Sequence, residues 1–189
     1  GIRHPFFTEE LLKQLLGTTS SSVKHPYCNL GNYCLSFIES MADNDICSLE
    51  VKTNILKDLF IGNTSERSGE KFNQLISDIP KEEQLPIFLK LHELFPTNAH
   101  FCSHLARYYA IEEKNAVEAL AYADKAINIS PEDPLLHHIK GICLRSIMYQ
   151  KIQKCLNEGT YQAAKHKLYD EIVVELLPKA AHEFEASRK

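Results

Sequence analysis

The amino-acid sequence predicts an all-α protein, and three patterns support this prediction. Apolar residues recur three or four positions apart along most of the chain, which is the period of an amphipathic helix. No stretch shows the sustained alternation of polar and apolar residues that indicates a half-buried strand. Pro96 and Pro131 end two apolar-periodic segments about 35 residues apart, because a proline lacks the donor that a continuing helix needs. We therefore expect repeated helical hairpins after a smaller helical part.

The first part of the chain, residues 1–70, is expected to be a small helical domain, and a winged helix is one form that it could take. Thr8 and Ser48 are good helix caps, and Gly17 and Gly62 stand where helices would end. In chain order we expect helices at 8–16, 29–42 and 48–61, separated by polar loops at 18–26 and 63–70.

Residues 71–189 are expected to form a second domain of helical repeats. It begins with a short helix or turn and a helix at 81–95, in which Pro86 is expected near the first helical position. We expect Leu85, Phe88, Leu89, His92 and Phe95 to anchor this helix. Further helices are expected at 135–157 and at 161–187, the second interrupted or kinked at Pro178.

Residues 98–131 predict two short helices joined by a polar turn. Ala106, Ala119 and Ala126 are small where two helices must approach closely, and Tyr109 is large where the gap must be filled. With Leu105 and Pro131, these residues resemble a tetratricopeptide repeat. Gly141 and Leu144 take the small and large positions of a following repeat, so the resemblance covers roughly residues 80–157.

The tetratricopeptide resemblance implies an α-solenoid with a concave face that binds other chains. It is a degenerate resemblance, since Ala123 stands where the family has an aromatic residue and the turn has one extra residue. An ordinary helical hairpin is the alternative interpretation.

Several segments also resemble the region that follows the nucleotide-binding module of STAND-type signalling ATPases. HPFFTEELL is similar to their winged-helix entry, and LARYY and LHHIKG are similar to their degenerate tetratricopeptide repeats. The family includes the sterile-alpha-motif-containing antiviral proteins of the "nine" type. The resemblance implies a scaffold or sensor segment of a larger cytoplasmic protein of innate immunity.

Composition and motifs argue against an enzyme. No glycine-rich phosphate loop, Gly-x-Ser-x-Gly elbow or His-Glu-x-x-His helix is present, so we expect no catalytic residues and no cofactor. The six cysteines form no Cys-x-x-Cys pair and are expected to be reduced thiols of a cytoplasmic protein. No apolar run is long enough for a membrane span. His100 and His104 have metal-ligand spacing but no visible third ligand, so a metal-dependent hydrolase is a distant alternative.

The candidate binding site follows from the repeat geometry that the resemblance implies. The first helix of each repeat would line the groove, which places His100, Ser103, Arg107, His138 and Arg145 on it. Such a face would bind an acidic protein segment, from another protein or from the parent chain, because arginine grips carboxylates with two hydrogen bonds.

Nucleic acid is the alternative partner, although a net charge of -4 gives it little general support. Lys140, Arg145, Lys151 and Lys154 lie along one expected helix, and some repeat proteins bind RNA along such surfaces.

Overall fold

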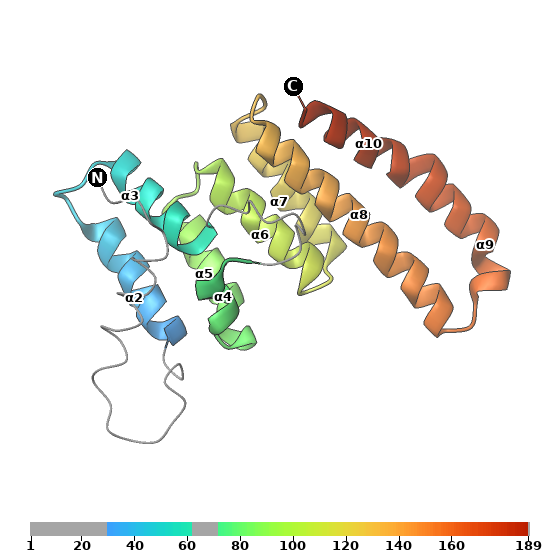
Figure 1. Cartoon of the computed structure of the whole chain (residues 1–189), viewed down its shortest axis with the longest axis horizontal. Coiled ribbons are helices and arrows are strands. Elements are labelled where there is room, and N and C mark those ends of the chain that lie inside the picture. The colour runs from blue at the N-terminus through green and yellow to red at the C-terminus, as the bar shows by residue number, and fades with distance from the viewer. Residues whose placement is uncertain (1–29, 62–71, 189) are drawn as a thin grey trace, which may run out of the picture. The chain divides into compact units, whose positions relative to one another are not determined.

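The computed structural model describes residues 30–61 and 72–188, and all of their regular structure is helical (Figure 1). The all-α class predicted from the sequence is therefore confirmed for the described residues, whereas the α-solenoid of repeats stays a prediction. The expected helix at 8–16, both expected polar loops and most of any winged helix lie outside them. The chain divides into two compact units, Gly1–Pro96 and Thr97–Lys189.

This division lies later in the chain than the expected one at residue 70, because α5 (Lys81–Leu94) packs on α2 (Leu30–Asp43). The backbone N–H of Gly31 donates to a carboxylate oxygen of Glu83 at 3.1 Å. Lys90 forms an ion pair with Glu39 at 3.5 Å. Helix α5 therefore belongs to the first unit.

The first unit also contains α3 (Leu49–Leu56), the π-helical segment η1 (Lys57–Ile61) and α4 (Gln74–Asp78). Ser48 caps α3 as predicted, since its side chain accepts a hydrogen bond from the Val51 N–H at 3.3 Å. The core of this unit is built from apolar side chains of all its helices, among them Cys34, Ile38, Leu56, Phe60, Leu75, Ile76, Phe88 and Leu91.

Two expectations about α5 were wrong. Pro86 lies inside the helix, five residues after its first residue, and it is exposed. The buried face carries Ile87, Phe88 and Leu91, whereas Leu89 is exposed. A leucine-rich helix offers two adjacent apolar stripes, and periodicity alone does not choose between them.

The second unit is built around the hairpin of α6 (Ala99–Ile111) and α7 (Ala116–Ile129). The predicted small positions Ala106, Ala119 and Ala126 are all fully buried there. Tyr109 stacks on Tyr122 with ring centroids 5.6 Å apart and planes 4° from parallel. Both helices pack on α8 (Pro134–Asn157), so that three helices share one core.

The chain then returns along α8 as one continuous helical rod formed by α9 (Tyr161–Tyr169), η2 (Asp170–Leu176) and α10 (Leu177–Ala186) (Figure 1). The helix does not end at Pro178, because the π-helical turns of η2 precede the proline and lead directly into α10. At Gly141, a Cβ atom would lie 2.7 Å from Cε1 of Phe184. Glycine thus permits the close approach of α8 and α10, at a position the sequence predicted to be small.

Candidate functional site

Among the described residues of the second unit, helix α8 is covered by neighbours on three sides and open on the fourth. Towards α6, the Ala110 carbonyl accepts hydrogen bonds from Ser146 Oγ at 2.9 Å and Gln150 Nε2 at 2.7 Å. Towards α7 and α10, Lys140 forms ion pairs, and Gly141 meets Phe184. At 3.6 residues per turn, five residues fall within about 60° of one another on the remaining side. We call them the open face: His138, Arg145, Tyr149, Ile152 and Leu156.

Three predicted site residues are brought together beside this face. Arg145 is exposed, and no ion pair to it is found among the described residues. His138 is exposed and makes an edge-to-face contact with Phe184, with centroids 5.6 Å apart. Burial lowers the pKa of His138, and the positive charges of Arg145 and Arg107 lower it further. The positive charges of Arg107 on α6 and Arg145 on α8 therefore both reach the ring of His138.

The other predicted residues have structural surroundings that the sequence did not indicate. Nε2 of His100 lies 3.4 Å from a carboxylate oxygen of Asp133, the residue that caps α8. The Ser103 hydroxyl donates to the His100 carbonyl at 2.9 Å. Ser103 is 1% exposed and Arg107 is 2% exposed, whereas an open groove would leave both accessible.

The reason for this difference is that α6 is buried on nearly every side, since ten of its thirteen residues are buried. Ile142, about one turn after His138 on α8, is buried as well. A binding role for the five predicted residues stays a prediction, and His138 and Arg145 are the two that are exposed.

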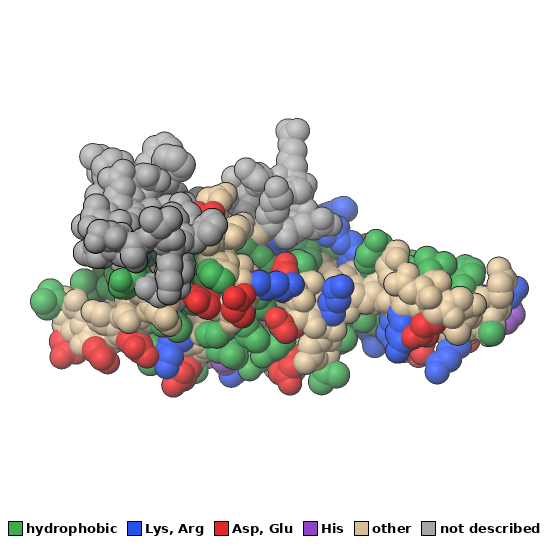
Figure 2. Space-filling view, turned by 90° about the horizontal axis from the view of Figure 1, so that it is seen from below, with side chains coloured by type: hydrophobic (Ala, Val, Ile, Leu, Met, Phe, Trp, Pro, Cys, Tyr) green, Lys and Arg blue, Asp and Glu red, His purple; other side chains and the backbone are tan. Residues whose placement is uncertain are grey.

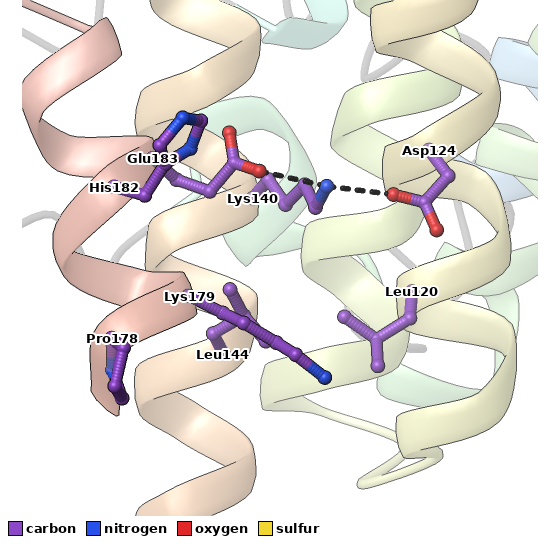
Figure 3. Close-up of a pocket in the computed structure, with 8 residues that line it drawn as sticks. All are labelled: Leu120, Asp124, Lys140, Leu144, Pro178, Lys179, His182 and Glu183. Carbon is purple, nitrogen blue, oxygen red and sulfur yellow. Dashed lines mark ion pairs between the residues drawn. The ribbon is translucent and has the colours of Figure 1, made fainter. Parts of the chain in front are cut away.

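The opposite side of α8 forms a cleft of about 440 Å³ with α7 and α10 (Figure 3). Lys140 lies between two carboxylates there, 2.8 Å from Asp124 and 2.7 Å from Glu183. Burial alone would lower the pKa of Lys140, but the hydrogen bonds to both carboxylates outweigh it and raise the pKa. The group stays an ammonium ion at neutral pH, so it ties helices together and is no nucleophile.

His137 completes this ion cluster. Its Nδ1 lies 2.6 Å from the second oxygen of Glu183, and its Nε2 lies 2.9 Å from the Pro131 carbonyl oxygen. Both partners are acceptors only, so both ring nitrogens must carry a proton for both hydrogen bonds to form. The geometry therefore calls for the imidazolium form, and the hydrogen bond to Glu183 is the main cause of a raised pKa.

The basic residues proposed for nucleic-acid binding are mostly neutralised. Besides Lys140, Lys151 is 2.8 Å from Glu171, and Lys154 is 4.0 Å from Glu158. This pairing weakens the nucleic-acid alternative, because a phosphate-binding stripe needs several uncompensated cations.

The residues described do not support the metal-dependent alternative. His104 is buried, and no group of three or more His, Cys, Asp or Glu side chains in this part of the chain is arranged to hold a metal ion. Within the same residues, no helix is long and apolar enough to cross a bilayer.

Sequence reasoning missed the apolar half of the open face. Tyr149 is 64% exposed and Leu156 is 49% exposed, and both lie on the same side of α8 as Arg145. The spacing 145–149–152–156 was a helical stripe in the sequence, but apolar stripes are usually interpreted as core.

Comparison with known proteins gives one distant relative. No protein-family model and no solved structure matches the chain. A mouse protein named "Sterile alpha motif domain-containing protein 9-like" is 27% identical over 153 residues, which is 77% of this chain but 9% of that protein. The chain therefore spans less than a tenth of its relative. The match hints at the same family as the resemblance of HPFFTEELL, LARYY and LHHIKG.

Proposed function

We propose that the chain is a non-catalytic helical interaction module of a larger cytoplasmic signalling protein, and that it binds an acidic protein segment on the open face of α8. The relative supports a place within a much longer protein. An innate-immune, antiviral setting rests on the family resemblance of the sequence. The tetratricopeptide-like pairing of α6 with α7 supports a scaffold rather than a catalyst.

The observation that carries the binding proposal is the contrast between the two sides of α8. Lys140 has two carboxylate partners at 2.8 Å or less, whereas no ion pair to Arg145 is found in the described part of the chain. The charge of Arg107 adds to the positive potential at His138. A carboxylate of a partner would find a bidentate guanidinium at Arg145 and a neutral imidazole at His138 for a hydrogen bond.

The test is the binding of a fluorescein-labelled, glutamate-rich peptide to residues 1–189, measured by fluorescence anisotropy at two salt concentrations. We expect Arg145→Glu to weaken binding at least tenfold. The matched control is Lys154→Glu, which makes the same change of charge on the same helix at a side chain that is 74% exposed and lies off the open face. Arg107 is a poor target for charge reversal because it is buried.

Equal affinity of Arg145→Glu and the unchanged chain would overturn the binding site. Tight binding of a single-stranded RNA of similar length, with a steep dependence on salt, would favour the nucleic-acid alternative. The assay measures the binding of acidic residues, and this binding is the same for a segment of the parent chain and for a segment of another protein.

A further inference from the structure

A second, apolar cleft of about 380 Å³ opens where α8 meets α9 and η2. Ile152 contributes from α8, and the residue lies on the open face. The remaining lining comes from α9 and η2: Tyr161, Lys165, His166, Leu168, Tyr169, Ile172 and Val173. The open face therefore runs without interruption from Arg145 into this cleft.

The cleft is flanked by large apolar side chains that are exposed to solvent. Tyr161, Tyr169 and Val173 line it on the returning helix, and on α8 the exposed Tyr149 and Leu156 lie about one turn before and after Ile152. Figure 2 shows hydrophobic side chains next to basic and acidic ones at the end of the molecule where α8 meets α9. Grouped apolar exposure of this kind is typical of a surface that another chain covers.

The formal charge at the lining of the cleft is positive and comes from Lys165. Lys165 and His166 line it, and none of its lining residues is an aspartate or glutamate. The nearby Glu171 is held by Lys151 at 2.8 Å and lies 3.9 Å from Lys167. An occupant with acidic residues is therefore favoured at this end, as it is at Arg145.

The dimensions fit a helix. From His138 to Leu156 the open face spans 18 residues, or about 27 Å at the rise of an α-helix. The groove between the antiparallel helices α8 and α9–η2 is the kind of surface that takes a third helix, with anchors at i, i+3, i+4 and i+7. Nucleic acid is disfavoured here because the floor of the cleft is aliphatic, with Ile152, Leu168 and Ile172.

We propose that the bound segment is an amphipathic helix of about 18 residues, with acidic residues over Arg145 and an aliphatic or aromatic stripe inserted between Tyr149 of α8 and Tyr169 of α9. This inference rests on the proposed function and names the class of partner. The acidic end sets orientation, and the apolar stripe supplies most of the buried area.

The experiment is a selection from a display library of 18-residue helical peptides, randomised on one face, against residues 1–189. We expect selected peptides to combine acidic residues in one end with apolar residues at i, i+3 or i+4, and i+7 in the other. Their affinities are then measured by anisotropy against Tyr149→Ser with Leu156→Ser, and separately against Tyr169→Ser. Each is expected to weaken binding at least tenfold, because all three side chains are exposed and their loss leaves the core intact.

The matched control is Val117→Ser, which removes another exposed apolar side chain (77%) from α7, away from the cleft. Failure to select any peptide, or selected peptides that lack the pattern, would overturn this inference. Binding that depends on Arg145 but is unchanged by the three cleft substitutions would refute the apolar docking and keep the proposed function. Binding that depends on the cleft residues but not on Arg145 would refute the acidic-segment site instead.

Discussion

Replacement of Glu183 by glutamine tests how α10 is attached to the rest of the second unit. Glu183 is a buried carboxylate whose two oxygens contact Lys140 at 2.7 Å and His137 at 2.6 Å. The amide has nearly the same shape but no charge, and its nitrogen cannot accept a hydrogen bond from the ring of His137. The substitution therefore removes the negative charge of Glu183 from α10 and changes the packing of this helix little.

The expected loss of stability is about 2–3 kcal/mol. A hydrogen bond to a charged group contributes about 1.5–3 kcal/mol, and the amide oxygen keeps a weaker bond to Lys140. The side chains of His137, Lys140 and Glu183 are all less than a quarter exposed, so solvent screens these pairs only weakly. For a chain of this size the loss corresponds to a decrease in Tm of about 4–12 °C.

The same cluster predicts a fall in stability above neutral pH. The pKa of His137 is raised in the folded state, so its contribution is fully present below the unfolded value of 6.5 and is lost as pH rises through the folded pKa. The pKa of Glu183 is lowered, because the hydrogen bonds to Lys140 and His137 outweigh the opposing effect of burial. Its contribution is therefore present above pH 4.5 and is lost only as pH falls through its folded pKa.

His138 and the buried thiols do not mask the effect between pH 6.5 and 8.0. The pKa of His138 is lowered, so its influence on stability changes only below 6.5. Burial raises the pKa of Cys34 and Cys143 to about 12 and that of Cys102 to about 11, while an unfolded thiol titrates at 9.0.

The assay is urea unfolding at pH 6.5 and at pH 8.0, together with hydrogen exchange of the α10 amides. The free energy of unfolding is expected to fall by at most about 2 kcal/mol across this range in the unchanged chain and to stay level in Glu183→Gln. Equal stability of the unchanged chain at both pH values would refute the doubly protonated state of His137.

Three further predictions concern packing, capping and reactivity. Gly141→Ala is expected to lower the free energy of unfolding by about 1–3 kcal/mol, because its Cβ would meet the ring of Phe184. Adding Phe184→Ala should recover part of this loss, and thermal unfolding of the two variants measures both effects. Asn98→Ala removes the acceptor for two N–H groups at the start of α6, so it should lower the free energy of unfolding by about 1 kcal/mol, measured by urea titration. An alanine at the exposed Lys154 is the control and should leave this free energy unchanged. Iodoacetamide at pH 8, followed by mass spectrometry, should modify half-buried thiols well before buried ones, and equal rates would contradict the burial. The half-buried thiols are Cys47 and Cys155, and the buried ones are Cys34, Cys102 and Cys143.

Helix positions were predictable because they depend on local chemistry. Apolar period and caps placed the helix at 29–42, observed as Leu30–Asp43, and the start of α3 at Ser48. The small residues Ala106 and Gly141 lie at close helix contacts because no larger residue fits there.

The candidate site was only partly predictable because burial depends on neighbours far away in sequence. Ser103 and Arg107 are polar types, which predict exposure, yet α6 is surrounded and both are buried. The stripe of Tyr149 and Leu156 had the pattern of a core face, and only the path of the returning rod shows that nothing described in the second unit covers it. The partners of Lys140 come from α7 and α10, at sequence separations that no local pattern encodes.

The matched charges on one side of α8 determine what the other side presents. A turn of α8 by one residue, or about 100°, would remove Lys140 from Asp124 and Glu183 and would move Arg145 away from the open side. The ion cluster therefore acts with the hydrogen bonds of Ser146 and Gln150 to Ala110 to set the rotation of α8, which is a role of buried polar groups in specifying one arrangement. It follows that Glu183→Gln should weaken peptide binding at the open face although Glu183 lies on the far side of the helix. One orientation of α8 thus places Lys140 against the carboxylates of α7 and α10, and it places Arg145 on the open face that is proposed to bind a partner.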